Sequence, residues 1–173
     1  QIAYGGNLMQ EIERKFRVLS LPFDVEKYPH YTIEQGYICT DPVLRVRMSG
    51  ELEDKGQVLR EAHCTLCYKS SGLMSHREES FPINVDQFQR LKEKAEGKVI
   101  EKVRYRIPLD PYMIELDLFK NVKDPMEPTM DLMMAEVEFP SEDEAMAFTT
   151  PEWFGEEVTL DKRYHNSEMT KSK

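Results

Sequence analysis

The sequence predicts an α+β fold that is mostly β, in which a sheet closes around a polar interior and helices pack outside. Two observations support this prediction. Charged side chains recur at every second position in several segments, with largely apolar residues between them; this is the period of a β-strand. Two other segments, residues 86–96 and 141–148, carry apolar residues at helical spacing.

The predicted strands share one pattern of alternating charge. In the first, Glu11, Glu13 and Lys15 lie on a single strand face. The pattern recurs at residues 44–48, 65–69, 102–106, 114–118 and 135–139. A solvated outer face is the usual reason for such alternation in one strand. Paired arginines and paired glutamates repel each other unless opposite charges or ligands lie across from them, so their recurrence favours a charged lumen. The apolar faces then point outward, where helices cover them.

Helices and turns separate these strands. The segment 86–96 ends at Gly97, a typical residue after a helix. Residues 141–144 have the sequence of a capping box, which opens a second helix. Further helices are expected near residues 22–28 and 160–169, and Asp-Pro and Ser-Gly pairs mark the turns.

Length and charge limit the class of protein. The 173 residues suit one domain, predicted over residues 9–173, with residues 1–8 expected to be a cloning remnant or a disordered lead-in. No apolar run approaches the roughly 20 residues of a transmembrane helix, so no membrane partner is expected. The net charge of −9 argues against nucleic-acid binding, although cations concentrated in a cavity could still bind phosphate.

The three cysteines do not suggest a disulfide framework. Their odd number and the lack of a secretory signal favour the reducing cytoplasm. Cys64 and Cys67 form a CxxC motif, but no second pair accompanies it. A three-residue offset on a strand points the two thiols to opposite faces, so both are interpreted as ordinary strand residues rather than zinc ligands.

The first strand also predicts chemistry. Glu11 and Glu13 share a face and repel each other unless positive charge lies between them. A divalent cation would satisfy both carboxylates, and Lys15 beside it suits an anion bound to that metal. This combination indicates a metal–phosphate site.

The motif Glu11-x-Glu13-x-Lys15 resembles the N-terminal ExExK signature of the CYTH superfamily, the triphosphate tunnel metalloenzymes. The resemblance extends over almost all of the chain from Met9 onward. It includes the Arg45-x-Arg47 pair and residues 65–70, 101–105, 115–117, 136–138, 153–158 and 161–164. The chain is most similar to the short bacterial inorganic tripolyphosphatases. The resemblance implies a closed, eight-stranded antiparallel β-barrel, a tunnel whose polar lumen holds a linear triphosphate.

The resemblance also implies roles for individual residues. Phosphate oxygens would be held by Lys15, Arg45, Arg47, Lys69, Lys102, Arg104 and Lys162. Mg²⁺ or Mn²⁺ would be held by Glu11, Glu13, Glu136 and Glu138. The acidic side would be completed by Glu78, Glu115 and Asp117. The residues expected to take part directly in catalysis are Glu11, Glu13, Lys15 and Glu138.

One position departs from the family pattern. Relatives often have two same-face carboxylates on the strand after the Lys69 turn, but here Ser80 follows Glu78 at the second position. Glu79 has the wrong parity to replace it. The change lowers the negative charge in the lumen, and its effect on metal preference stays open.

The favoured function is metal-dependent hydrolysis of a phosphoanhydride bond in a small anionic triphosphate, with inorganic tripolyphosphate as the preferred substrate. The alternatives on this fold are a class IV adenylate cyclase, a thiamine triphosphatase and a non-catalytic module that binds polyphosphate or nucleotides. No segment is dedicated to a base pocket, which disfavours the cyclase. The oligomeric state stays open, with a homodimer among the alternatives.

Overall fold

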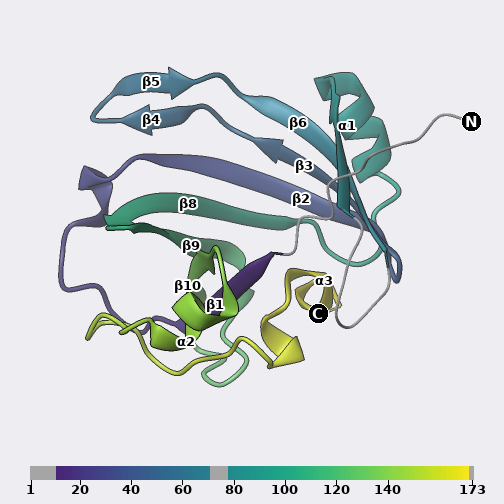
Figure 1. The fold of residues 1–173 in the computed structure, drawn as a ribbon. Coiled ribbons are helices and arrows are strands. Elements are labelled where there is room, and N and C mark those ends of the chain that lie inside the picture. Colours follow the sequence, from purple (N-terminus) through teal and green to yellow (C-terminus); the bar gives the residue numbers. More distant parts are fainter. Residues whose placement is uncertain (1–10, 71–77, 172–173) are drawn as a thin grey trace, which may run out of the picture.

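The computed structural model describes residues 11–70 and 78–171, in which the main element is a ten-stranded antiparallel sheet (Figure 1). The expected lead-in, residues 1–8, lies outside the described residues. Eight strands form a continuous path in the order β1-β10-β9-β8-β2-β3-β6-β7. Their bounds are β1 (Ile12–Arg17), β2 (His30–Thr40), β3 (Val43–Ser49), β6 (His63–Lys69), β7 (Glu78–Ile83), β8 (Ile100–Leu109), β9 (Tyr112–Lys123) and β10 (Asp131–Phe139).

A small hairpin extends from this path. It consists of β4 (Leu52–Asp54) and β5 (Gln57–Arg60), and β4 also pairs with β2. Lys55 and Gly56 at its tip have positive φ angles, which suits a tight hairpin turn. The sequence analysis did not predict this hairpin, since its four-residue second strand carries no alternating charge.

The register of the sheet places the predicted charged residues on one face. Lys15 is opposite Glu136, and Glu136 is in turn opposite Glu115 on the next strand. Arg104 is opposite Asp117. Since register partners share a face, the alternation in sequence becomes a continuous charged inner surface. Figure 1 shows the strands curving round this surface from β6 through β2 and β8 to β10.

The predicted closed barrel is not confirmed. The terminal strands of the path, β1 and β7, do not pair with each other within the described residues. Part of the free edge of β1 is instead covered by the C-terminal segment. The Lys15 carbonyl accepts from the Val158 N–H (2.8 Å), and the Arg17 N–H donates to the Glu156 carbonyl (2.9 Å). Backbone groups satisfied in this way are not available to β7.

The outer face near β3 and β6 is covered by helix α1 (Val85–Lys92), which confirms the helix predicted for this region. Asn84 and Gln87 form a reciprocal capping box at its N-terminus, and the helix ends before Glu93. Phe88 is fully buried against Val46 and Cys64. The capping box was not part of the sequence prediction, which began the helix at residue 86.

The outer face of β1 and β10 is covered by helix α2 (Glu142–Ala147). Ser141 caps it by accepting a hydrogen bond from the Glu144 N–H (3.2 Å), as the sequence predicted. Ala145 packs in a core with Leu116 and Val137. The predicted arrangement, apolar faces outward beneath helices, is therefore confirmed for both helices.

The remaining predicted helices are shorter than expected. Residues 22–28 contain only the 3-10 turn η1 (Val25–Lys27), and the last segment contains the 3-10 turn η2 (Lys162–Tyr164) and helix α3 (Asn166–Met169). Tyr164 and Met169 pack on the inner face, in a core whose other members are Tyr37, Ile100, Phe119, Val122, Leu132, Met134 and Val158. The inner surface is thus charged over only part of its length. Within residues 11–70 and 78–171, no helix is both long and apolar enough to cross a bilayer.

Candidate active site

A cavity of about 930 Å³ lies on the charged inner face of the sheet. It brings together most of the predicted site residues, which line it from seven strands and the loop residue Glu11: Glu11, Glu13, Lys15, Arg45, Arg47, Lys69, Glu78, Arg104, Glu115, Glu136 and Glu138. Lys102 and Asp117 are fully buried behind the lining. Lys162 is exposed on η2 and does not line the cavity.

The arginines of β3 have little charge compensation from the residues that the structure describes. The Arg47 Nε–H donates to the Gln35 side-chain carbonyl (3.1 Å), and the Arg45 Nε–H is buried without a hydrogen-bond partner. Within the described residues, neither arginine forms an ion pair with a carboxylate. Burial, together with the like charges of Arg45 and Arg104, lowers the pKa of Arg47 to about 10. Half-buried cations without carboxylate partners favour an anionic ligand.

Lys15 is held among carboxylates on the opposite side of the cavity. Its Nζ lies 3.0 Å from Glu13 Oε1 and 3.9 Å from Glu136 Oε1. Burial opposes protonation of Lys15, but the negative charges of Glu136 and Glu13 outweigh it and raise the lysine pKa. Lys15 therefore stays protonated at neutral pH and can serve as a cation toward phosphate.

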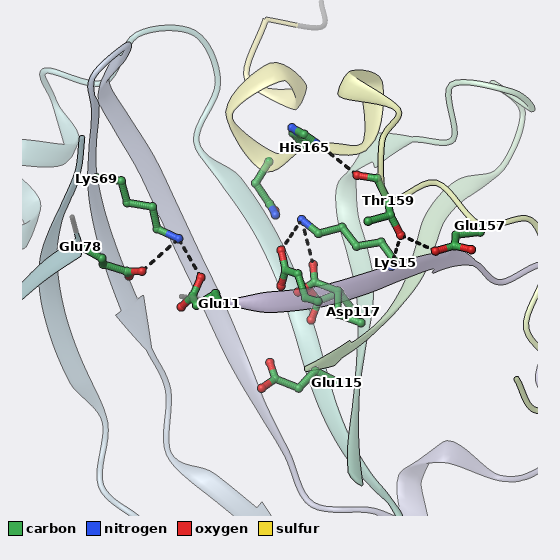
Figure 2. Close-up of polar contacts among 12 residues, drawn as sticks. Glu11, Lys15, Lys69, Glu78, Glu115, Asp117, Glu157, Thr159 and His165 are labelled. Atoms are coloured by element: carbon green, nitrogen blue, oxygen red, sulfur yellow. Dashed lines mark hydrogen bonds and ion pairs between the residues drawn. The ribbon is translucent and has the colours of Figure 1, made fainter. Parts of the chain in front are cut away.

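Lys69 links the two unpaired ends of the sheet (Figure 2). Its Nζ lies 3.2 Å from Glu11, beside β1, and 3.3 Å from Glu78 on β7. The Cys67 thiol donates to the same Glu78 carboxylate (3.3 Å), whereas Cys64 lies in the core beneath α1. The two thiols therefore lie on opposite faces, as predicted. Ser80 is opposite Cys67 in the register, which confirms that the position of the second carboxylate is held by serine.

Lys102, Arg104 and Asp117 form a buried ionic triad. Asp117 accepts hydrogen bonds from Lys102 Nζ (2.6 Å), Arg104 Nε (2.7 Å) and Arg104 Nη2 (2.8 Å). Although burial favours a neutral carboxyl, Arg104 and Lys102 hold the pKa of Asp117 well below its ordinary range. Burial lowers the pKa of Lys102 to about 8. Lys102 is thus shielded from the cavity, while Arg104 is largely neutralised by Asp117 and Glu115.

The carboxylates of the cavity suit a hard divalent cation. Burial and the neighbouring charges of Glu11, Glu115 and Glu13 raise the pKa of Glu138, and Glu136 Oε1 is buried without a hydrogen-bond partner. Both features indicate that positive charge is needed here, and oxygen ligands are those that Mg²⁺ and Mn²⁺ prefer. Across residues 11–70 and 78–171, no three Asp, Glu, His or Cys side chains converge closely enough to hold a metal ion as they stand.

Comparison with known proteins identifies the family. No model of a known protein family matches the chain. It is 43% identical over 169 residues to the inorganic triphosphatase of Nitrosomonas europaea, covering 95% of this chain and 99% of that protein. It is 34% identical over 165 residues to the inorganic triphosphatase of Acetivibrio thermocellus, covering 94% of each. The chain belongs to the inorganic triphosphatases of the CYTH superfamily.

Solved structures agree with this assignment to the inorganic triphosphatases. The crystal structure of the inorganic triphosphatase NE1496 superposes with a TM-score of 0.67 at 37% identity, covering 97% of this chain and 99% of that one. The PH1819 protein from Pyrococcus horikoshii shares the fold, with a TM-score of 0.52 at 17% identity over 79% of this chain and 83% of that one. The resemblance inferred from the ExExK motif is therefore confirmed.

Several residues line the cavity of this inorganic triphosphatase family member although the sequence analysis did not assign them to the site: Tyr37, Arg106, Thr159 and His165. Arg106 carried a usable signal, because it is the third inner-face cation of the 102–106 alternation. Thr159 accepts a hydrogen bond from the Lys15 N–H (3.0 Å) and donates to Glu157 (2.8 Å), while His165 Nε2 lies 3.3 Å from the Thr159 carbonyl (Figure 2). The positions of Thr159 and His165 depend on how the C-terminal segment packs against the sheet, and no local sequence pattern predicts that packing.

Proposed function

We propose that this chain hydrolyses a phosphoanhydride bond of a linear triphosphate, with inorganic tripolyphosphate as its preferred substrate. The names of its relatives support the reaction class. The observation that carries the proposal for the site is the pair Arg45 and Arg47, which line the cavity two residues apart on β3, half-buried and without carboxylate partners among the described residues. Two neighbouring half-buried guanidinium groups repel each other, and a multiply charged anion bound between them offsets that repulsion.

The arginines and lysines of the cavity would bind the triphosphate in different ways. Guanidinium groups at Arg45 and Arg47 can each hold two phosphate oxygens, and Lys15 and Lys69 can add single charges. Charge spreads over the transferred phosphoryl group and the leaving oxygen in the transition state. Cations already positioned around that charge stabilise it without having to reorganise, and this is how the cavity would accelerate hydrolysis.

The carboxylates would hold the metal and orient the attacking water. Glu11, Glu13, Glu136 and Glu138 are the residues proposed to hold Mg²⁺ or Mn²⁺, with Glu78 and Glu115 supporting them. When bound, the ion would neutralise phosphate oxygens and make water more acidic. The raised pKa of Glu138 suits a carboxylate that accepts a proton from water, since a stronger base is the better acceptor.

One assay tests the reaction against its alternatives. The protein is incubated with tripolyphosphate, ATP or thiamine triphosphate, each with Mg²⁺ or Mn²⁺ and with EDTA as a control. Release of orthophosphate from tripolyphosphate at the highest kcat/KM, abolished by EDTA, is the expected result. Formation of cyclic AMP and pyrophosphate from ATP would identify an adenylate cyclase. A higher kcat/KM for thiamine triphosphate would identify a thiamine triphosphatase, and the absence of turnover with all three substrates would indicate a non-catalytic binding module.

A closed barrel is proposed for the triphosphate-bound protein. Lys69 bridges Glu11 and Glu78 between the unpaired ends of the sheet, and a triphosphate that binds Lys15 of β1 together with Lys69 of β6 would draw these ends closer. Spin labels at Ile12 and Phe81 would measure the separation of β1 and β7. The distance should shorten when tripolyphosphate is added; an unchanged distance would refute closure.

The cytoplasmic location, the absence of a nucleic-acid partner and the homodimer stay predictions. Sedimentation at several protein concentrations would decide between monomer and dimer. Fractionation of cells that express the protein would test its location, and a gel-shift titration with duplex and single-stranded DNA and RNA would test nucleic-acid binding.

A further inference from the structure

Strand β8 carries three cations on the inner face of the sheet, at successive alternate positions. Lys102 and Arg104 are both paired with Asp117, so much of their charge is compensated within the protein. The third cation, Arg106, lines the cavity, and no carboxylate pairs with it in the part of the chain that the structure describes. The three residues look equivalent in sequence but differ in whether their charge is available to a ligand.

The expected partner of Arg106 is already engaged. Glu115 lies opposite Arg106 in the register of β8 and β9, yet its carboxylate forms an ion pair with Arg104. The Arg106 Nε–H is buried and has no hydrogen-bond partner. A buried donor without a partner destabilises a protein, so such groups are uncommon unless a ligand or water satisfies them.

The position of Arg106 differs from that of the β3 arginines. Ile100 of β8 is opposite Gln35, and Gln35 is opposite Arg47, so Arg106 lies well beyond the level of Arg47 along β8. The cations that lower the pKa of Arg47 are Arg45 and Arg104. Arg106 stands beyond them, beside the carboxylates of β9 and β10 that line the same cavity.

We propose that Arg106 is a substrate-binding residue that holds the phosphoryl group on the carboxylate side of the cavity and so favours three-phosphate chains over shorter anions. The inference rests on the proposed function and adds a specificity residue to it. A short anion can be held by Arg45 and Arg47 alone. A longer chain extends further along the cavity toward Arg106, whose fork of donors matches phosphate oxygens.

The test measures binding without turnover. Affinities for tripolyphosphate and pyrophosphate are determined by calorimetry in EDTA for the native protein, Arg106→Met, Arg106→Lys and the control Arg90→Met. Arg90 is an exposed residue of α1, so its replacement changes net charge equally without touching the cavity. Loss of charge-assisted hydrogen bonds should weaken tripolyphosphate binding roughly 10- to 100-fold in Arg106→Met. The tripolyphosphate affinity of Arg106→Lys should lie between those of the native protein and Arg106→Met. The affinity for pyrophosphate should change much less in both variants.

The outcomes separate this inference from the proposed function. Tripolyphosphate affinity of Arg106→Met equal to that of Arg90→Met would overturn the inference, and equal weakening for both anions would overturn the role in chain-length selection. If the native protein binds tripolyphosphate without hydrolysing it, the proposed activity is refuted. Weaker tripolyphosphate binding by Arg106→Met would still support Arg106 as a binding residue in that case. Melting temperatures check folding: Arg106→Met should melt no lower than the native protein, since it removes an unpaired buried donor.

Discussion

Asp117 is a buried carboxylate on which two cations depend. Its side chain is fully inaccessible and accepts three hydrogen bonds from Lys102 and Arg104. Asp117→Asn keeps the shape and removes the charge. Both cations then stay buried with less compensation, because Arg104 retains Glu115 and the more distant Glu136, while the hydrogen-bond partner left to Lys102 is the Asn166 side-chain oxygen at 3.2 Å.

The expected loss of stability is large. Removing one partner of a buried ion pair typically costs 3–5 kcal/mol, roughly, because the remaining charge is left desolvated. For a chain of this length that corresponds to a fall in melting temperature of roughly 6 to 20 °C. Asp131→Asn is the matched control, since Asp131 pairs with Lys123 at the surface with both side chains about 60% exposed. Such exposed pairs contribute less than about 1 kcal/mol.

The pH dependence provides a second measure of the same triad. Burial lowers the pKa of Lys102 to about 8 in the folded protein, against about 10.4 for an unfolded lysine. Between those values the unfolded chain binds the proton and the folded chain does not, so stability should rise with pH by up to about 3 kcal/mol. Lys102→Met should lack this rise. In Asp117→Asn it should begin at lower pH, because the carboxylate that supports the lysine charge is gone.

Urea unfolding at pH 7.0, 8.5 and 10 measures both effects. A loss in Asp117→Asn no greater than that in Asp131→Asn would refute the buried triad as a source of stability. Identical pH profiles for the native protein and Lys102→Met would refute the lowered lysine pKa. Partial recovery of stability in Asp117→Asn combined with Lys102→Met would show that the uncompensated lysine is responsible.

Three further predictions follow from the site and its supports. Arg47→Met should lower kcat/KM for tripolyphosphate roughly 10²-fold or more while the melting temperature holds or rises, since a buried cation beside like charges is removed; a stability loss equal to the activity loss would contradict this. Glu138→Gln should stabilise the protein in EDTA and reduce the rise in melting temperature on adding Mg²⁺, whereas an unchanged Mg²⁺ effect would remove Glu138 from the metal site. Tyr164→Phe should cost about 1–3 kcal/mol in urea unfolding, because Asp124 loses the buried 2.6 Å hydrogen bond from the hydroxyl; a cost below about 0.5 kcal/mol would refute that role.

Much of the sheet was predictable because its side-chain period is local. Glu13, Lys15, Arg104 and Glu136 were assigned to one face from alternation alone, and the register places them there. The two covering helices were predictable from spacing and capping for the same reason. Such patterns depend only on neighbours in the chain, so a single sequence contains them.

Closure of the barrel was not predictable, because it depends on contacts between distant segments. The edge of β1 that β7 would need is partly taken by residues 155–158, and Phe16 is bridged to Glu157. Nothing in the first strand indicates that its edge will be occupied by a segment so far along the chain. The position of Lys162 also depends on distant contacts: the turn η2 directs Tyr164 into the core and leaves the lysine exposed, outside the cavity lining, so its role at the tunnel mouth stays a prediction.

The alternation of charge identifies which side chains face the cavity, but binding depends on which of them remain uncompensated. Lys102, Arg104 and Arg106 have the same strand parity, and only their partners distinguish them. Asp117 neutralises part of the charge of Lys102 and Arg104. Glu115 pairs with Arg104, so the charge of Arg106 is left without a carboxylate partner among the described residues. If Arg106 binds phosphate independently of Glu115, Glu115→Gln should leave Arg104 held by Asp117 and the more distant Glu136, and the tripolyphosphate affinity that depends on Arg106 should not change. A loss of tripolyphosphate affinity in Glu115→Gln as large as that in Arg106→Met would show instead that the two residues act as a pair.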